Sequence, residues 1–533
     1  MKVVVIGGVA GGATAAARIR RLDEHAEIII FERTKYISYA NCGMPYYIGG
    51  KIMDSEDLTL QSPESFWNRF KIRVKVCHEV IKISPEKKSV LVRNLESGQE
   101  FEEGYDKLIL SPGAKPIIPD VTALERENVF TLRTVEDTFK IKAFIERKKP
   151  TTAVIAGGGF IGIEMAENLA EQGIRVTLLQ RSNQLLEPID YDMACILHAH
   201  MRKKGINLIF GQAATGQEDA DIVILAIGVS PDSALAKTAG LKLGAKESIL
   251  VNDRMETSCP DIYAVGDAVE IEHRVTGQKA LISLAGPANK QGRIAADNIC
   301  GGNSTFKGSL GSSVIKVFNM TAASTGINEK TAKRQGISYE KVILTPASHA
   351  SYYPGASYMT MKVLYEKETL RILGAQIVGY DGVDKRIDVL ATAIYAGLTA
   401  LDLKDLDLAY APPYSSAKDP VNMAGFMIEN IETARIKQYH WDEVETLPRD
   451  GSVILLDSRT RGEYYAGHID GFINIPVDEL REHIAELKQN KPVYVMCHSG
   501  LRSYIACRIL MQNGIDCYNF SGGYGFYRTV FAR

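Results

Sequence analysis

The sequence of 533 residues predicts an α/β protein built around two open parallel sheets, followed by a smaller α+β segment and a further α/β module. Three observations lead to this prediction. A strand, a glycine-rich turn, a helix and a second strand occur in that order near residue 1 and again near residue 152. Another strand, turn and helix follow near residue 493. The chain is also too long for one hydrophobic core, and about 150 residues per domain gives three or four domains.

The composition is that of an ordinary globular protein, with 45% hydrophobic and 24% charged residues. A formal charge of -2 gives no reason to expect nucleic acid or a membrane as partner. No stretch approaches the ~18 uninterrupted apolar residues that a membrane span needs, and glycine pairs interrupt the apolar N-terminus, which superficially resembles a signal peptide. Eight cysteines without a C-x-x-C pair argue against a disulfide framework and against a metal site. We therefore expect the protein to be located in the reducing cytoplasm.

The first glycine-rich unit lies in "KVVVIGGVAGGATAAARIRRLDEHAEIIIFER", where residues 3–6 and 27–31 read as buried strands and 13–22 as a helix. Such a turn brings backbone N–H groups at the helix N-terminus to a pyrophosphate. Val9 stands where the middle glycine of G-x-G-x-x-G usually lies. Glu32 follows the second strand, where a carboxylate accepts hydrogen bonds from a ribose. The turn contains Gly7, Gly8, Gly11 and Gly12.

The second unit, "TTAVIAGGGFIGIEMAENLAEQGIRVTLLQR", has Gly157, Gly159 and Gly162 in full register between a strand and a helix. Two such units in one chain predict two dinucleotide-binding folds. Gln180 fills the acidic position of the second fold, with Arg181 beside it. A carboxylate there would favour NADH, whereas a neutral residue beside an arginine tolerates a 2′-phosphate, so the choice between NADH and NADPH stays open.

Two buried strands, within residues 105–116 and 220–232, break at a glycine, and "DIYAVGDAVE" ends a strand at Asp267, whose carboxylate can reach a flavin. With these segments, residues 1–430 resemble the two-dinucleotide disulfide-reductase flavoproteins. The resemblance implies FAD on the first fold, NAD(P)H on the second, and a homodimer. The domains it implies are FAD-binding 1–112 and 246–307, NAD(P)H-binding 113–245 and dimerisation 308–432.

Cys42, in "SYANCGMPYYIGG", is alone in the region where most of those reductases have a C-x4-C pair. With one thiol, the enzyme must form a mixed disulfide with its substrate or oxidise to a sulfenic acid. The Gly/Pro-flanked turn allows a helix to begin there, and a helix N-terminus favours the thiolate. A buried, inert cysteine is the structural alternative.

The segment resembles the single-cysteine branch of that group, which contains coenzyme A disulfide reductases, NADH oxidases and NADH peroxidases. The oxidases and peroxidases have a histidine where this chain has Ala10, which disfavours peroxide chemistry. Arg18 and Arg21 lie three apart on one helix face and suit an anionic nucleotide, although a solvated face is the alternative. Ser38 and Asn41 match positions that line the pantetheine path of the coenzyme A reductases.

In the resembling family, tyrosines of the dimerisation domain reach the partner's cysteine and hydrogen-bond a leaving thiolate. Tyr414, in "APPYSSAKDP", matches one such position, and Tyr353, in "SYYPGA", is our choice for the other, with Tyr352 as the alternative. Ordinary interface packing is the other explanation of these tyrosines. The segment 212–219, "QAATGQED", is shorter than the family's usual β-hairpin, and we expect no effect on the chemistry.

Residues 440–533 form a separate module in which Cys497 follows an apolar strand, 493–496, and precedes a helix in "VMCHSGLRSYIA". Inward-facing N–H groups of such a turn, with Arg502 closing it, stabilise a thiolate or a persulfide anion. Together with Asp457 and Glu463, this pattern resembles a rhodanese domain, which implies that Cys497 carries sulfane sulfur. The six-residue loop is that of sulfurtransferases, since related phosphatases normally have seven.

The sequence thus predicts a flavin-dependent reductase that uses NAD(P)H to reduce coenzyme A disulfides, coenzyme A persulfides and polysulfide-derived sulfur, fused to a rhodanese domain. We expect the catalytic set to be Cys42, Cys497, Tyr353, Tyr414 and Arg502. Two alternatives remain: an NADH oxidase or peroxidase, and a redox-sensing sulfur-carrier protein. The rhodanese module favours a persulfide over a plain disulfide as substrate.

Overall fold

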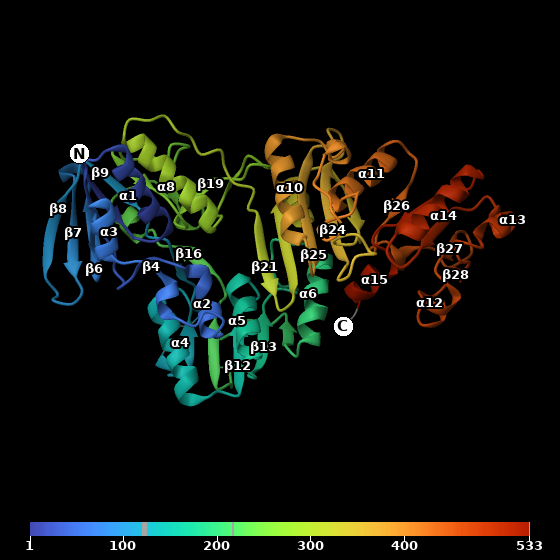
Figure 1. Cartoon of the computed structure of the whole chain (residues 1–533), viewed down its shortest axis with the longest axis horizontal. Coiled ribbons are helices and arrows are strands. Elements are labelled where there is room, and N and C mark those ends of the chain that lie inside the picture. Colours follow the sequence, from blue (N-terminus) through green and yellow to red (C-terminus); the bar gives the residue numbers. More distant parts are fainter. Residues whose placement is uncertain (120–124, 216–217, 532–533) are drawn as a thin grey trace. The chain divides into compact units, whose positions relative to one another are not determined.

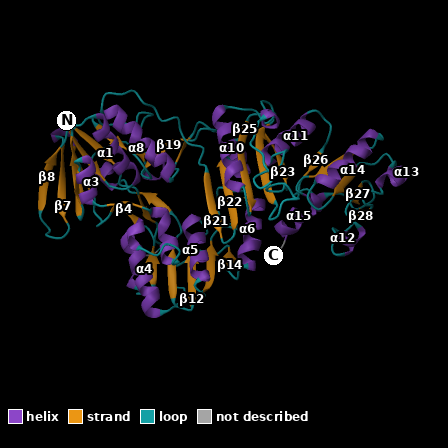
Figure 2. Ribbon diagram, in the orientation of Figure 1, coloured by secondary structure: helices purple, strands orange, loops and turns teal. Residues whose placement is uncertain are grey.

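The computed structural model describes residues 1–119, 125–215 and 218–531 (Figure 1). The chain divides into two compact units. Unit 1 consists of Met1–Leu185 and Lys204–Gly311, and unit 2 of Leu186–Lys203 and Ser312–Arg533. Both units combine helices with strands (Figure 2), so the α/β class predicted from the sequence is confirmed.

The first sheet of unit 1 is parallel and has the strand order β18-β9-β1-β2-β5. Its central strand is a nearly continuous buried run, because helices cover a parallel sheet on both faces. Helices α1 and α8 pack so closely that a Cβ on Gly292 would lie 2.4 Å from the carbonyl oxygen of Gly11. The elements are β1 (Lys2–Ile6), α1 (Ala10–Leu22), β2 (Glu27–Phe31), α3 (Pro63–Phe70), β5 (Arg73–Lys75), β9 (Lys107–Leu110), β18 (Ile262–Ala264) and α8 (Ala285–Ile299).

The second parallel sheet of unit 1 has the order β11-β15-β12-β13-β14. Between the two sheets, β10 (Ala114–Pro116) and β16 (Val229–Pro231) pair antiparallel, at the two segments where the sequence predicts breaks after buried strands. The segment 212–219 is described except for residues 216–217, so the prediction about its length lies partly outside the described residues. The elements are β11 (Val129–Thr131), α4 (Val135–Lys148), β12 (Thr152–Ala156), α5 (Phe160–Glu171), β13 (Arg175–Gln180), β14 (Asn207–Phe210) and β15 (Ile222–Leu225).

Smaller elements complete unit 1. Strands β3 and β4 pair antiparallel, and α2 lies between them in the sequence. The meander β6-β7-β8 lies between β5 and β9 in the sequence, and β17 and β19 of the small sheet β17-β19-β20 lie on either side of β18. They are β3 (Ile37–Tyr39), α2 (Met44–Ile48), β4 (Thr59–Gln61), β6 (His78–Ser84), β7 (Ser89–Asn94), β8 (Glu100–Gly104), α7 (Ala234–Thr238), β17 (Ile249–Leu250), β19 (Val269–Glu272) and β20 (Lys279–Ala280).

Unit 2 begins with an antiparallel sheet of order β21-β22-β25-β24-β23. Its strands β24 and β25 are buried over most of their length. Helix α6, whose sequence lies between β13 and β14 of the second parallel sheet, belongs to unit 2 and contacts β25. The elements are α6 (Tyr191–Lys203), β21 (Ser313–Val317), β22 (Met320–Gly326), α9 (Glu329–Gln335), β23 (Tyr339–Leu344), β24 (Met359–Glu366), β25 (Ile372–Gly379), α10 (Val383–Ala396) and α11 (Pro420–Glu432).

The C-terminal part of unit 2 is a parallel sheet of order β26-β30-β29-β27-β28. Its last helix, α15, packs on α6. The elements are β26 (Gln438–Tyr439), β27 (Ile454–Asp457), α12 (Arg461–Tyr465), β28 (Ile473–Asn474), α13 (Ile484–Leu487), β29 (Val493–Met496), α14 (Leu501–Gln512), β30 (Cys517–Phe520) and α15 (Gly523–Phe531). Across the described residues, none of the helices has both the length and the apolar character that a membrane crossing requires.

Candidate functional site

The two glycine turns of unit 1 have the same construction. Gly7 and Gly157 adopt φ angles of 93° and 106°, a region open to glycine. A Cβ on Gly12 would lie 2.0 Å from the carbonyl oxygen of Gly7, and a Cβ on Gly162 would lie 1.8 Å from that of Gly157. Glycine at these positions is therefore what allows each helix to start so close to the preceding strand.

A residue at the end of the second strand of each fold binds back to the turn. The amide of Gly8 donates a hydrogen bond to Glu32 Oε2 at 2.9 Å, and the amide of Gly158 donates to Gln180 Oε1 at 3.0 Å. The first helical turns consist of small or apolar residues, Ala10 to Ala13 and Phe160 to Ile163, so no carboxylate competes for their N–H groups. Both turns thus fit the pyrophosphate of a dinucleotide.

Asp267 follows β18 through Gly266, which has a φ of 85°. Its Oδ2 pairs with Arg133 at 2.9 Å, and both side chains keep partial exposure. The carboxylate thus stays held at the carboxyl end of the first sheet, the edge at which open α/β sheets bind their ligands.

Cys42 lies in a short 3-10 helix, Asn41–Gly43, between β3 and α2, and its side chain is exposed within unit 1. Desolvation by the surrounding chain raises the pKa of this thiol, and the charges of Glu164 and Asp267 raise it further. These contributions oppose the thiolate that the sequence predicts at this turn. Helix α2 has only five residues.

Glu164 is a site residue that the sequence analysis missed. It lies on α5, and Tyr46 Oη of α2 donates a hydrogen bond to its Oε1 at 3.3 Å. Burial raises the pKa of Glu164 to about 7. Its charge acts on Cys42, so a group that titrates near neutral pH lies within electrostatic reach of the thiol. The sequence carries no signal for this contact, because 118 residues separate Tyr46 from Glu164.

The residues expected to bind coenzyme A differ in their surroundings. Arg18 Nε pairs with Asp297 Oδ1 at 2.7 Å, whereas Arg21 is exposed. Ser38 has a φ of 45°, and its amide donates to the carbonyl of Gly8 at 2.8 Å. The Oδ1 of Asn41 is buried and has no hydrogen-bond partner among the described residues. A buried acceptor without a partner, next to Cys42, fits an amide N–H of a bound pantetheine arm.

The three candidate tyrosines of unit 2 are exposed, with 73% of Tyr352, 43% of Tyr353 and 72% of Tyr414 accessible. The hydroxyl of Tyr352 is hydrogen-bonded to that of Tyr410 at 2.9 Å, a partner that the sequence analysis did not anticipate. The Tyr353 ring instead packs edge-on against His349. Tyr352 and Tyr410 therefore present a pair of phenols at the surface of unit 2.

Cys497 follows β29 directly and is buried. Its sulfur accepts hydrogen bonds from the Gly500 amide at 3.1 Å and from Ser503 Oγ at 3.3 Å. Gly500 has a φ of 97°, which turns the chain into α14 and directs its amide at the sulfur. This arrangement stabilises negative charge on sulfur, as the sequence predicts.

Arg502 forms a two-pronged ion pair with Glu463, with both N–O distances at 2.7 Å. The guanidinium, aided by hydrogen bonds from Thr460, holds the pKa of Glu463 at about 2. Thr460 and Glu463 also form the capping box of α12. The same carboxylate therefore starts a helix and neutralises the arginine of the Cys497 loop.

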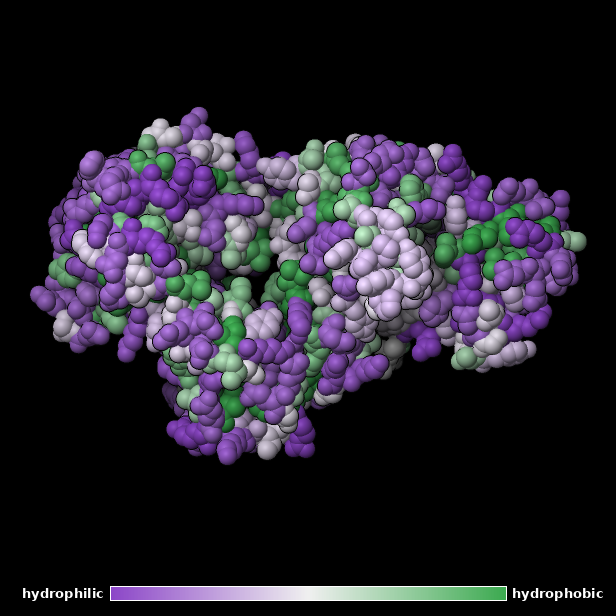
Figure 3. All heavy atoms as spheres, viewed as in Figure 1, coloured by the Kyte–Doolittle hydropathy of each residue, from purple (hydrophilic) through white to green (hydrophobic). Residues whose placement is uncertain are grey.

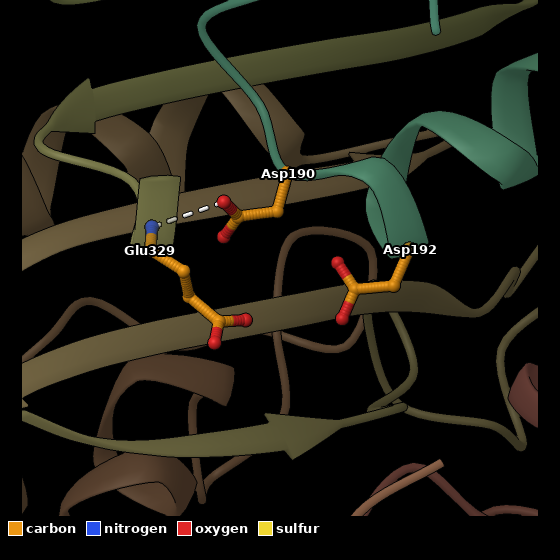
Figure 4. Close-up of side chains that lie close together, drawn as sticks. All are labelled: Asp190, Asp192 and Glu329. Carbon is orange, nitrogen blue, oxygen red and sulfur yellow. Dashed lines mark hydrogen bonds between the residues drawn. The ribbon is translucent and has the colours of Figure 1, made fainter. Parts of the chain in front are cut away.

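Three carboxylates in unit 2, Asp190, Asp192 and Glu329, have oxygens within 4.8 Å of one another (Figure 4). The ammonium of Lys362, which is fully buried, lies among them, 2.9 Å from Asp190 and from Asp192. Trp441 Nε1, in the segment between β26 and β27, donates to Asp192 Oδ2 at 3.1 Å. A lysine thus supplies the positive charge that this acidic cluster requires.

Residues 1–292 match the family described as pyridine nucleotide-disulphide oxidoreductase, 312–420 its dimerisation domain and 440–527 the rhodanese-like domain. A coenzyme A disulfide reductase of Staphylococcus aureus (strain JH9) is 40% identical over 438 residues, which cover 80% of this chain and 99% of the relative.

Solved structures are similar over nearly the whole chain. Reduced Bacillus anthracis CoADR-RHD is 49% identical with a TM-score of 0.97, covering 100% of this chain and 98% of that one. A NAD-dependent persulfide reductase from A. fulgidus is 38% identical with a TM-score of 0.92, covering 99% and 100%. A water-forming NADH oxidase from Lactobacillus brevis is 28% identical with a TM-score of 0.77, covering 82% and 99%.

Two dinucleotide turns beside a lone cysteine, with a separate loop that binds a buried cysteine sulfur, define the class as a nucleotide-dependent thiol oxidoreductase. The chain belongs to the pyridine nucleotide-disulphide oxidoreductase family and carries a C-terminal rhodanese-like domain. The family membership implies FAD and NAD(P)H as cofactors.

Proposed function

We propose that this protein is a reductase that uses NAD(P)H and FAD to reduce coenzyme A disulfides and coenzyme A persulfides through Cys42. In this proposal Cys497 receives or delivers sulfane sulfur. The observation that carries it is the state of the two thiols: Cys42 is exposed without a second cysteine in its loop, and Cys497 is buried with two hydrogen-bond donors at its sulfur. The names of the two whole-chain neighbours, which contain CoADR-RHD and persulfide reductase, point the same way.

In the reductase half, the thiolate of Cys42 attacks the sulfur attached to coenzyme A in CoA–S–S–R. The S–S bond breaks, R–S⁻ leaves and takes a proton, and a Cys42–S–S–CoA mixed disulfide forms. FAD, when bound, would supply the two electrons of NAD(P)H that reduce such a disulfide. Asn41 would accept a hydrogen bond from the pantetheine arm, and Arg18 and Arg21 would face the nucleotide phosphates.

The leaving thiolate needs a proton donor, and the exposed phenols of unit 2 are suited to the task in a homodimer. Tyr352 and Tyr410 share a hydrogen bond, and Tyr414 is almost as exposed as Tyr352. We assign Tyr352, whose hydroxyl is hydrogen-bonded to that of Tyr410, the role of proton donor to the thiolate that leaves at Cys42 of the partner subunit. Tyr353 and Tyr414 stay as neighbours of that site. The match of residues 312–420 to a dimerisation domain supports the dimer.

In the rhodanese half, the Cys497 thiolate attacks the terminal sulfur of a donor. The donor's S–S bond breaks, the donor fragment leaves with the electron pair, and Cys497 becomes a persulfide. The Gly500 amide and the Ser503 hydroxyl, which donate to the thiol sulfur, would stabilise that anion. All eight cysteines are free thiols, which fits the cytoplasm as the compartment.

The test is a substrate panel of CoA disulfide, CoA persulfide, glutathione disulfide and peroxide, assayed with NADH and with NADPH. Cys42→Ser should retain bound flavin and lose CoA disulfide reduction at least 100-fold, because no other thiol of its loop can form the mixed disulfide. Cys497→Ser should retain that activity and lose sulfur transfer. Cys259→Ser, a partly exposed thiol elsewhere in unit 1, serves as the matched control. CoA disulfide turnover that survives Cys42→Ser contradicts the proposal, and oxygen or peroxide turnover above disulfide turnover would favour an NADH oxidase or peroxidase.

A further inference from the structure

The loop around Cys497 offers little free positive charge. Between Cys497 and Arg502 the sequence reads C-H-S-G-L-R, so Arg502 is its one permanent cation. Both outer nitrogens of that guanidinium are bound to Glu463, each at 2.7 Å. An arginine held by a carboxylate in this geometry has its charge neutralised at short range and its best donors used.

Two further arginines of the segment that carries Glu463 are also paired. Arg459 is buried against Asp457, with an N–O distance of 2.6 Å, and Arg461 pairs with Glu479 at 2.5 Å. The charge that acts on Arg502 beyond Glu463 comes from Cys497 and Asp457. The arginines at 459, 461 and 502 thus carry compensated charges.

The helix that leaves the loop adds an apolar surface. Leu501 and Ile505 lie four residues apart on α14, hence on one face, and keep 60% and 42% of their surface exposed. In Figure 3, hydrophobic residues gather on the part of the surface where Figure 1 labels α14. A ligand that approaches the loop along this face meets hydrocarbon before it meets the sulfur.

We propose that Glu463 is a specificity-determining residue that makes the Cys497 site select persulfides with an uncharged organic arm over small inorganic dianions such as thiosulfate. This inference rests on the proposed sulfur-handling role of Cys497 and adds the class of donor. Glu463 acts through Arg502: it cancels the cation that a dianion would require, and Leu501 and Ile505 face the organic arm.

The organic persulfide and thiosulfate differ in the leaving group that sulfur transfer to Cys497 releases. With an organic persulfide, R–S–SH, the Cys497 thiolate attacks the terminal sulfur, the S–S bond breaks, and R–S⁻ leaves. The proton of the transferred sulfur then passes to R–S⁻, and the products are the Cys497 persulfide anion and R–SH. With thiosulfate, the same attack on the outer sulfur releases sulfite, a dianion, from a loop whose one arginine is already paired with Glu463.

The experiment measures sulfur loading of Cys497 in the full-length flavoprotein without NAD(P)H, by intact-mass detection of one added sulfur atom. The donors are pantetheine persulfide and thiosulfate. Glu463→Gln removes the negative charge while the glutamine oxygen can still accept the capping bonds of Thr460. Glu463→Asp keeps the charge, and Glu479→Gln makes the same charge change on the other ion pair of α12. Cys497→Ser defines the background.

The wild type should load from pantetheine persulfide and only slowly from thiosulfate. Glu463→Gln should speed thiosulfate loading about tenfold, the effect of one unit charge on a dianion roughly 6 Å away in water. The gain should shrink with added salt, and the persulfide rate should change little. Glu479→Gln should behave as wild type, and Glu463→Asp, which keeps the negative charge, should gain far less than Glu463→Gln.

Two results would overturn the inference alone: equal wild-type loading from both donors, or a thiosulfate rate unchanged by Glu463→Gln. An equal gain with Glu463→Asp would also overturn it, because loop geometry and not charge would then set the preference. Loading from neither donor would instead remove the proposed role of Cys497, and the inference with it.

Discussion

The buried ammonium of Lys362 should hold unit 2 together, and Lys362→Met tests this. The side chain has no exposed surface and lies 2.9 Å from both Asp190 and Asp192, with Glu329 as a third partner. Methionine fills a similar volume but leaves the carboxylates without their shared cation. Breaking a buried pair by removing one partner costs about 3–5 kcal/mol. Because Lys341 still binds Glu329 at 2.9 Å, we expect about 4 kcal/mol for the whole cluster rather than a sum over three pairs.

The loss should also depend on pH. In the wild type, burial opposes the ionisation of Glu329, but Lys362 and Lys341 outweigh it and hold its pKa well below the usual range. Without Lys362, the carboxylates of the folded protein should have pKa values above those of the unfolded chain. Such a penalty is fully present above the raised folded pKa and is relieved as the pH falls through it. Lys362→Met should therefore be more destabilising at pH 8 than at pH 5.

Tryptophan fluorescence during urea unfolding provides the assay, since the chain has two tryptophans, Trp67 and Trp441. In a Trp67→Phe background the signal comes from Trp441, which donates to Asp192 and so reports on the cluster directly. Lys330→Met is the matched control, because it breaks an exposed pair with Glu187 and should cost less than about 1 kcal/mol. A Trp441 transition that shifts no more for Lys362→Met than for Lys330→Met would refute the reasoning.

Two further predictions concern unit 1. Burial raises the pKa of Glu164 from the ordinary 4.5 to about 7, so the folded state holds its proton through that window. Stability therefore falls as the pH rises from 4.5 to 7, by about 3 kcal/mol. Glu164→Gln should flatten that dependence and, by removing a negative charge, lower the pKa of Cys42. The rate of Cys42 alkylation by iodoacetamide, measured against pH with Glu171→Gln as control, tests this. A pH profile that Glu164→Gln leaves in place would contradict the prediction. Gly162→Ala should cost about 1–3 kcal/mol and weaken nicotinamide binding, because its Cβ would meet the Gly157 carbonyl at 1.8 Å. Gly286→Ala, where a Cβ meets nothing within 4 Å, should be neutral or stabilising, and equal thermal shifts for the two glycines would contradict the packing argument.

Local patterns in the sequence were sufficient to predict the structural features that depend on residues close together in the chain. The strand before Cys497 was expected at 493–496 and is β29, Val493–Met496, because a short apolar run and a glycine turn are encoded within a few positions. The two glycine turns are of the same kind, since their spacing is fixed by one strand and one helix. The α/β class followed from the same signals.

Contacts between distant residues were not predictable in this way. Lys362 and Asp192 are 170 residues apart, and Tyr352 and Tyr410 are 58 apart, with no periodicity to connect them. The same holds for the pKa of Cys42, which desolvation raises and which Glu164 and Asp267, distant from it in the sequence, raise further. Glu463 was recognised as part of a motif, but its pairing with Arg502 required the structure.

Helix α6 has a consequence for any attempt to dissect the enzyme. The chain leaves unit 1 after Leu185, returns at Lys204 and leaves again after Gly311, so one cut cannot release unit 2 intact. A fragment that starts at Ser312 would lack α6, and with it Asp192, the acceptor of Trp441, and the surface on which α15 packs. The rhodanese-like module is thus joined to the rest of the chain by more than a tether, because an excised module would expose the surface of α15 that packs on α6. A fair comparison needs point variants in the whole chain.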